Sequence, residues 1–197
     1  GFVPNLVWTK QRTDDSGGAW MDSVRGDDAY LQTTNTNAEG NFANITFTST
    51  GYNVNGNDNL NNENAHNYVG WAWKAGTAFS NDASATSVGS IDSAGSVNTD
   101  VGFSIITYTG TGSNATVAHG LSVAPSLYFV KYRNAGGDWK TYSEDVGNSY
   151  QGFLEGTGAF HNTGASIWQN TSPTTSVFSI GTNGGVNTNG GNYVAYL

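Results

Sequence analysis

One nine-residue pattern of alternating bulky and polar residues occurs twice in this chain. Pro4–Arg12 reads PNLVWTKQR and Pro125–Arg133 reads PSLYFVKYR, 121 positions later. A proline followed by alternating bulky and β-branched residues is typical of a β-strand with a fixed entry. An internal repeat of this kind predicts that one structural unit is duplicated.

Further short apolar runs, bounded by Gly, Asn and Thr, predict the other strands. In the first half they are Trp20–Val24, Ala29–Gln32, Ile45–Thr48, Tyr52–Val54 and Tyr68–Trp73. In the last of these runs Val69, Trp71 and Trp73 share one face, which predicts that both tryptophans lie in the core. The second half repeats the order, and we pair Trp20 with Trp139, Leu31 with Leu154, Phe47 with Phe178, and Tyr68-Val69 with Tyr193-Val194. The unequal separations predict that loops changed length while strands persisted.

These patterns divide the chain into a first repeat copy at residues 1–75, a connection at 76–101 and a second copy at 102–197. The connection is rich in Ala, Ser, Gly and Asp, and its length leaves room for one or two short strands. The second copy opens with a strand at Gly102–Thr109 and a returning segment at Ala115–His119, which the first copy lacks. We therefore expect either a longer polypeptide or a neighbouring chain that covers the bare edge.

Composition supports an all-β fold. Aromatic residues make up 13 % of the 197 residues, charged residues only 11 %, and there are 27 glycines. Such a chain favours strands and turns over helices with charged surfaces, so we expect an antiparallel β-sandwich of jelly-roll or lectin-like shape, built from two related copies. The net charge of −8 and the lack of a basic stripe argue against nucleic-acid binding. No apolar run is long enough for membrane insertion, and there is no cysteine.

Six motifs follow one another along nearly the whole chain: Gly1–Arg12, Asp22–Gly26, Tyr68–Gly76, Gly102–Tyr108, His119–Pro125 and Val194–Tyr196. In these motifs the chain resembles a repeated β-rich domain of bacteriophage tail-fibre and virion structural proteins, frequent in phages of marine and aquatic bacteria. The resemblance implies a virion-associated, host-facing protein, with other virion proteins or further copies of itself as partners. It implies no active site. The alternative is that the chain belongs to a secreted bacterial protein.

Two Lys-x-Arg pairs, Lys10/Arg12 and Lys131/Arg133, are the most persistent charged feature. Two cations beside an aromatic ring suit an acidic sugar or a phosphate. The structural alternative, which we favour, is that they pair with Asp22, Glu144 or loop carbonyls. Both pairs and the prolines Pro4 and Pro125 then mark the repeat.

The candidate ligand-binding residues lie on two kinds of segment. Trp20 and Trp139 follow Gly-rich turns and have polar neighbours, so we expect them to be half-exposed platforms for sugar rings, although most tryptophans in β-sandwiches are core. The Asn-rich loop 55–67 is seven residues longer than its counterpart and offers oxygen ligands to Ca²⁺ or a glycan. Its candidate residues are Asn57, Asp58, Asn59, Glu63 and His66.

No enzyme motif is present: the chain has no His-Glu-x-x-His, no Gly-x-Ser-x-Gly and no P-loop. The prediction is a non-enzymatic structural domain of a phage tail fibre or appendage that contributes to adhesion to host-surface glycans, with no cofactor other than a possible Ca²⁺. The alternatives are a polysaccharide depolymerase, whose carboxylate pair separate loops would supply, and a carbohydrate-binding module of a secreted protein.

Overall fold

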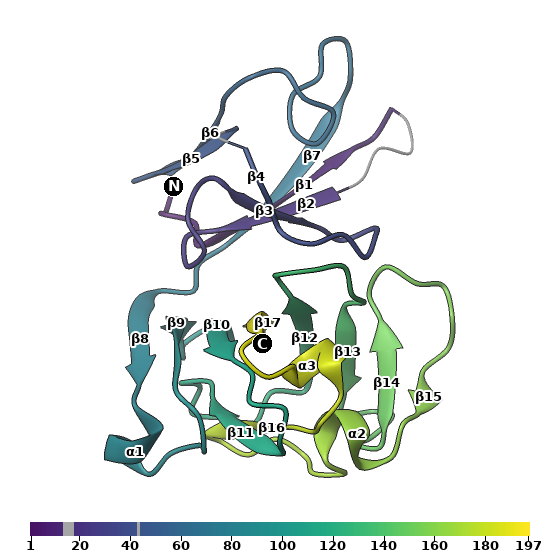
Figure 1. The fold of residues 1–197 in the computed structure, drawn as a ribbon. Helices are drawn as coiled ribbons and strands as arrows, with labels where there is room; N and C mark the ends of the chain where they lie inside the picture. Colours follow the sequence, from purple (N-terminus) through teal and green to yellow (C-terminus); the bar gives the residue numbers. More distant parts are fainter. Residues whose placement is uncertain (14–17, 43) are drawn as a thin grey trace.

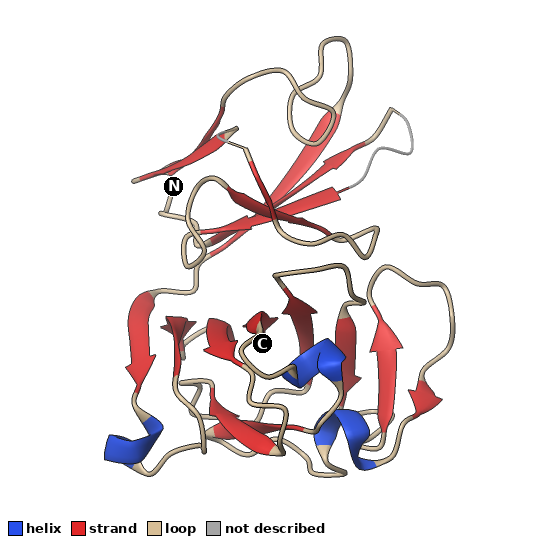
Figure 2. Ribbon diagram, viewed as in Figure 1, coloured by secondary structure: helices blue, strands red, loops and turns tan. Residues whose placement is uncertain are grey.

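The computed structural model describes residues 1–13, 18–42 and 44–197, and antiparallel strands dominate it (Figures 1 and 2). These strands form two large sheets, one hairpin and one two-stranded ribbon. The helices are single turns: α1 (Ala83–Thr86), α2 (Ala165–Trp168) and α3 (Gly184–Asn187). The prediction of an all-β sandwich is confirmed.

The first half of the chain forms a five-stranded sheet in the order β4-β3-β2-β1-β7. Its strands are β1 (Leu6–Gln11), β2 (Gly18–Asp22), β3 (Ala29–Gln32), β4 (Gly40–Asn41) and β7 (Tyr68–Trp73). A hairpin of β5 (Ile45–Thr48) and β6 (Gly51–Val54) packs on one face of this sheet. Val7, Met21 and Ile45 form the core between sheet and hairpin, partly closed by Leu60 from the Asn-rich loop.

The second half forms an eight-stranded sheet in the order β15-β14-β13-β12-β17-β10-β9-β8. Its strands are β8 (Thr77–Asn81), β9 (Ser93–Asn98), β10 (Phe103–Thr109), β12 (Leu127–Tyr132), β13 (Lys140–Ser143), β14 (Tyr150–Phe153), β15 (His161–Asn162) and β17 (Asn192–Tyr196). The ribbon of β11 (Ala115–Ala118) and β16 (Val177–Ile180) covers the face of this sheet that points away from the five-stranded sheet. The 76–101 connection therefore contributes β8 and β9 to this sheet.

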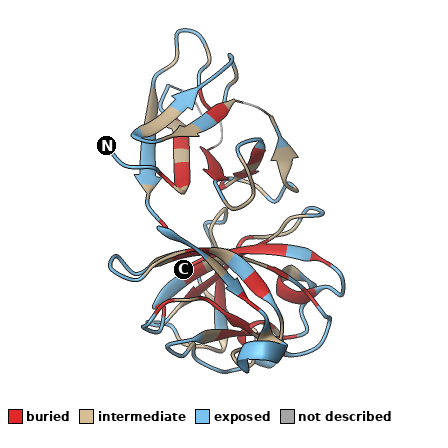
Figure 3. Ribbon diagram, turned by 90° about the vertical axis from the view of Figure 1, so that its left-hand side faces the viewer, coloured by how far each residue is buried: buried red, intermediate tan, exposed pale blue. Residues whose placement is uncertain are grey.

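Three apolar cores separate four layers, from the β5–β6 hairpin to the β11–β16 ribbon (Figures 1 and 3). The middle core joins the two large sheets through Leu6, Trp20, Trp139 and Tyr196. Strand β17 has cores on both of its faces, because Val194 belongs to the middle core and Ala195 to the outer one. This explains why four of its five residues are buried without the alternation of a half-exposed strand.

From β1 to β4 and from β12 to β15, the two sheets repeat one backbone plan at an offset of 121 residues. Leu6 lies opposite Asp22 as Leu127 lies opposite Ser143, and Tyr30 lies opposite Gly40 as Gln151 lies opposite His161. Loop hydrogen bonds repeat as well: those from the amides of residues 23, 26, 29, 33 and 42 recur at residues 144, 147, 150, 154 and 163, each to a carbonyl 121 positions later. These shared bonds support the proposal of a duplicated unit.

The register corrects two of the residue pairs predicted from the sequence. At an offset of 121, Trp20 corresponds to Thr141, Trp139 to Gly18, and Leu31 to Gly152. Matching tryptophan with tryptophan and leucine with leucine displaced the alignment by two residues. Counted at this register, the loops that connect β1 to β4 have the same lengths as those that connect β12 to β15. The offset grows only afterwards, to 125 at Val69 and Val194, which face Lys10 and Lys131 in the same register.

Candidate ligand-binding cleft

A cleft of about 680 Å³ lies between the two large sheets. Strands β1, β2 and β7 supply one wall, and β10, β12 and β17 supply the other. Seven aromatic side chains line it: Trp8, Trp20, Trp71, Trp73, Phe103, Phe129 and Tyr196. Its size and apolar character are those of a small-molecule binding site.

The register of β1 and β7 builds the most accessible part of this wall. Trp8 lies opposite Trp71, and their ring centroids are 4.7 Å apart at a tilt of 32°. Trp71 is 42 % exposed, whereas Trp8 and Trp73 are half-buried. The prediction that Trp71 is a core residue is therefore wrong, because its face of β7 opens onto the cleft rather than onto a packed layer. Trp73 also lines the cleft, with its ring centroid 6.5 Å from that of Phe103 on the opposite wall.

Few polar groups line the cleft. They are the side chains of Lys10, Thr33, Thr34 and Tyr196, and none of the lining residues, all from the described part of the chain, is Asp or Glu. In the wall, the indole N–H groups of Trp8 and Trp20 are buried and have no hydrogen-bond acceptor among the described residues. A buried donor without a partner costs about 1–3 kcal/mol. A ligand hydroxyl that reached either one after a small side-chain shift would offset that cost.

Trp20 and Trp139 are buried, 6 % and 0 % exposed, so the prediction that they are half-exposed is wrong. They meet each other where the sheets face, with ring centroids 5.2 Å apart and nearly perpendicular planes. The indole of Trp139 also donates a hydrogen bond to the carbonyl of Gln32 at 2.9 Å. Trp139 thus joins the sheets, and Trp20, although buried, also lines the cleft.

Beside this contact, a buried charge network links the halves. Arg25 binds Asp22 and, at 3.0 Å, Glu39, and Glu39 accepts two 2.8 Å bonds from Arg133. The Tyr196 hydroxyl donates to Asp22 at 2.6 Å. Burial by itself would lower the pKa of Arg25. The charges of Asp22, Tyr196 and Glu39 outweigh this effect, so the pKa is raised. Burial alone would raise the pKa of Glu39, but bonds from Arg133 and the charge of Arg25 lower it on balance.

The second Lys-x-Arg pair has a structural role. Lys131 is fully buried and donates to the carbonyls of Thr36 and Gly137, and Arg133 pairs with Glu39 rather than with Asp22 or Glu144. Burial lowers the pKa of Lys131 to about 8, against the opposing effect of Glu155 and Asp138. Thr36 and Glu39 belong to the loop region between β3 and β4, so this pair holds the first half against the second.

In the first pair, Lys10 lines the cleft, and Arg12 is exposed just beyond the end of β1. The prolines of the repeat, Pro4 and Pro125, are buried ahead of β1 and β12. The two Lys-x-Arg pairs therefore occupy equivalent backbone positions in different surroundings.

The Asn-rich loop is held by hydrogen bonds within the first half, on the face of the sheet away from the cleft. Asp58 accepts bonds from the amides of Leu60 and Asn61 and from the side chain of Asn44. The Asn57 side chain accepts one from the Asn64 amide at 3.0 Å, and the Asn59 carbonyl accepts one from Tyr68.

Two further candidates, Glu63 and His66, both contact Gln11 of β1. Among the described residues, no group of three or more His, Cys, Asp and Glu side chains could hold a metal ion. The structure thus places the loop candidates away from both candidate tryptophans, and the Ca²⁺ site stays a prediction.

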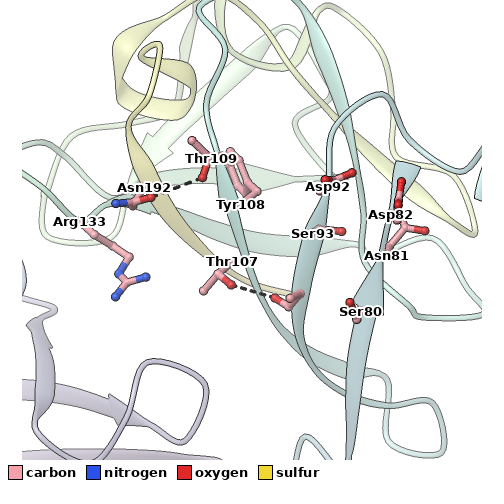
Figure 4. A pocket seen from close by; sticks show the side chains of 11 residues that line it. Ser80, Asn81, Asp82, Asp92, Ser93, Thr107, Tyr108, Thr109, Arg133 and Asn192 are labelled. Carbon is pink, nitrogen blue, oxygen red and sulfur yellow. Dashed lines mark hydrogen bonds between the residues drawn. The ribbon is translucent and has the colours of Figure 1, made fainter. Parts of the chain in front are cut away.

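A second hollow, of about 340 Å³, lies over β8, β9, β10 and β17 (Figure 4). Its charged side chains already have partners within the protein. Asp82 caps α1, Asp92 accepts a bond from the Ala83 amide at 2.9 Å, and Arg133 is held by Glu39. This hollow is a weaker candidate than the aromatic cleft.

None of the helices in the described ranges is long and apolar enough to cross a membrane. No curated protein and no solved structure matches the chain. One family does match, over residues 1–197, and its description is a domain of unknown function, DUF7483. With this match, which includes both sheets and the cleft between them, the chain belongs to the DUF7483 family.

Proposed function

We propose that this protein is a non-enzymatic adhesion domain that binds a saccharide of a bacterial host surface in the aromatic cleft. The observation that carries the proposal is the solvent-accessible pair of Trp8 and Trp71 in a cleft of about 680 Å³. The apolar face of a sugar ring packs well on an indole, and the hydroxyls at its edge would meet Lys10, Thr33 and Thr34.

The sequence resemblance to phage tail-fibre and virion structural proteins supplies the biological setting of the proposal. In that setting the domain is a structural unit of a host-facing appendage. Repetition of the domain along a fibre or in an oligomer would make weak contacts with one saccharide add up to firm attachment.

The cleft favours binding over hydrolysis. Glycosidases use two carboxyl groups on opposite sides of the scissile bond, about 5–10 Å apart. Among the described residues, the side chains that line this cleft include neither Asp nor Glu. A depolymerase would thus need carboxyl groups from outside these lining residues, and binding alone needs only the groups present.

The test is binding of the full chain to an array of capsular and lipopolysaccharide oligosaccharides, followed by titration of the best binder. Trp71→Ala removes the exposed ring, and we expect an affinity at least about fivefold weaker, in line with roughly 1 kcal/mol for one aromatic contact. Tyr150→Ala is the matched control, because Tyr150 is 37 % exposed and does not line the cleft. Shortening the 55–67 loop should also leave affinity unchanged.

Three results would contradict the proposal. They are no binding to any oligosaccharide, equal losses for Trp71→Ala and Tyr150→Ala, and loss of binding with the shortened loop alone. Release of reducing sugar from the bound polysaccharide would favour the depolymerase alternative.

A further inference from the structure

Strand β7 is the last strand of the five-stranded sheet, and its equivalent in the other sheet is an internal strand. In the eight-stranded sheet, β17 lies between β12 and β10. In the five-stranded sheet, β7 pairs with β1, and no strand of the described chain pairs with its other edge. The shared register of Lys10 with Val69 and of Lys131 with Val194 makes the two strands directly comparable.

The hydrogen-bond phase identifies the backbone groups at that edge. In an antiparallel ladder, alternate residues direct both backbone groups to the same neighbour. The Arg12 amide donates to the Asn67 carbonyl, so Val69 and Trp71 face β1, whereas Tyr68, Gly70 and Ala72 face outward.

The same phase holds in β17, where the outward groups have partners. Arg133 donates to Asn192, so Val194 and Tyr196 face β12. Ser104 and Leu197 exchange both bonds, so Tyr193, Ala195 and Leu197 face β10. Gly70 and Ala72 of β7 therefore correspond to Ala195 and Leu197, which bind β10.

Strand β7 also lacks the features that usually protect an edge. It has six residues and contains no proline and no charged side chain, and both Gly70 and Ala72 are exposed. Native proteins normally cover, shorten, twist or charge such an edge, because its free backbone groups pair with other strands. Both edge strands at the opposite ends of the sheets, β4 and β15, are two residues long.

We propose that the open edge of β7 binds an extended antiparallel strand of the β10 type, contributed by a related repeat unit and not by a second copy of this chain, in which β10 is already held between β17 and β9. The strand fits chemically because the side chains of β10 alternate between the two layers that flank β17. Ile106 and Tyr108 pack in the outer core, and Ile105 and Phe103 pack in the core between the sheets.

On β7, the corresponding side chains would have apolar neighbours on both sides. One set would extend toward the β5–β6 hairpin, where the Tyr52 hydroxyl approaches Gly70, and the other would lie beside Trp71 and Trp73. The added strand would thus lengthen the wall of the cleft. Addition of a strand depends on backbone groups of β7, whereas saccharide binding depends on side chains of the cleft. Either proposal can therefore fail without the other.

The experiment uses the full chain and a labelled peptide with the sequence of residues 102–109, made soluble by a lysine tail. Two singly N-methylated versions separate the two edges of the peptide. Methylation at the position of Ile106 blocks an amide that would face β7, and methylation at the position of Thr107 blocks one that would face solvent. We expect saturable binding by fluorescence anisotropy, at least tenfold weaker for the first version and nearly unchanged for the second.

Hydrogen exchange of the complex locates the peptide, with protection expected at Gly70 and Ala72. The variant Ala72→Pro removes one outward amide, a change that edge strands tolerate, and should abolish peptide binding while thermal stability is kept. The proposal is overturned by no binding, by equal effects of the two methylations, or by protection at β8 instead of β7. A dimer of the chain alone, with protection along β7, would also overturn it, since a second copy would then occupy the edge.

Discussion

Trp139, directly before β13, occupies the position that Gly18 of β2 holds in the five-stranded sheet. Both residues accept the same loop hydrogen bond, Gly18 from Thr33 and Trp139 from Leu154. A Cβ at Gly18 would lie 2.5 Å from the indole nitrogen of Trp8, so no larger residue fits there. The first sheet has no room for a large side chain at this position, whereas the second half has an indole ring there.

Trp20 and Thr141 show the reverse arrangement, with the large residue in the first sheet. Because the two sheets face each other, a ring that projects from one requires a small residue or a gap on the other. The two sheets thus share one hydrogen-bonding plan, whereas the side chains with which they face each other are complementary. The cleft lies where this complementarity ends, beside Trp71 and Phe103.

Removing Trp139 is the strongest way to break the contact between the sheets. We expect Trp139→Ala to lower the free energy of unfolding by about 3–5 kcal/mol, because the fully buried ring leaves a cavity and the Gln32 carbonyl loses its donor. Denaturation in urea, followed by tryptophan fluorescence and circular dichroism, measures the change. Trp71→Ala is the matched control and should cost less than about 1 kcal/mol, because Trp71 is partly exposed.

Equal losses for the two tryptophan variants would contradict this assignment of Trp139 to the contact between the sheets. Two separate unfolding transitions in Trp139→Ala would sharpen it, because they would show that each half folds without the other.

Two equivalent glycines test whether the halves share local backbone geometry as well as register. Gly26 and Gly147 have φ values of +101° and +91°, and a Cβ would meet nothing within 4 Å at either. The cost of Gly26→Ala and of Gly147→Ala is therefore backbone strain alone. We expect roughly 1–2 kcal/mol in each case, equal within about 0.5 kcal/mol. Thermal unfolding of the two variants and the double variant measures this, and a large difference would show that the turns are not equivalent.

Much of the fold could be predicted from sequence because period-two alternation, turn residues and the Pro-to-Arg motif are local signals. The strands at Leu6–Gln11, Tyr68–Trp73 and Phe103–Thr109 follow those signals closely. It was harder to predict which positions of the two halves correspond, because matching identical residues aligned Trp20 with Trp139. Gly26 and Gly147, each four residues after the end residue of a strand, keep the offset of 121 that the Pro-to-Arg motif shows.

The cleft could not be predicted, because it depends on how two sheets face each other. Trp8 and Phe129 were recognisable as equivalent aromatic positions beside lysines, but nothing in their alternation tells whether the facing layer covers them. For the same reason the sequence predicts Trp71 in the core and Trp139 as half-exposed, and both predictions are wrong. Phe103 and the adjacent Thr33 and Thr34 come from two separate segments, and no local motif connects them.

The smallest expected effect concerns Lys131, the equivalent of Lys10, which is buried between the two halves. Its pKa of about 8 lies below that of an unfolded lysine, near 10.4. Between these values the unfolded chain holds a proton that the folded chain has released, so stability rises with pH. We expect a gain of about 1 kcal/mol from pH 8 to 9.5, after allowance for screening by solvent close to the surface.

Lys131→Met should remove this gain, because methionine fills a similar volume without a charge. The acidic neighbours Asp138 and Glu155 stay in place, so their contributions are common to the variant and the original protein. Urea denaturation at intervals of half a pH unit gives the two curves. Parallel curves would mean that Lys131 is solvated like an ordinary lysine, and that the contact between the sheets is looser at this point than at Trp139.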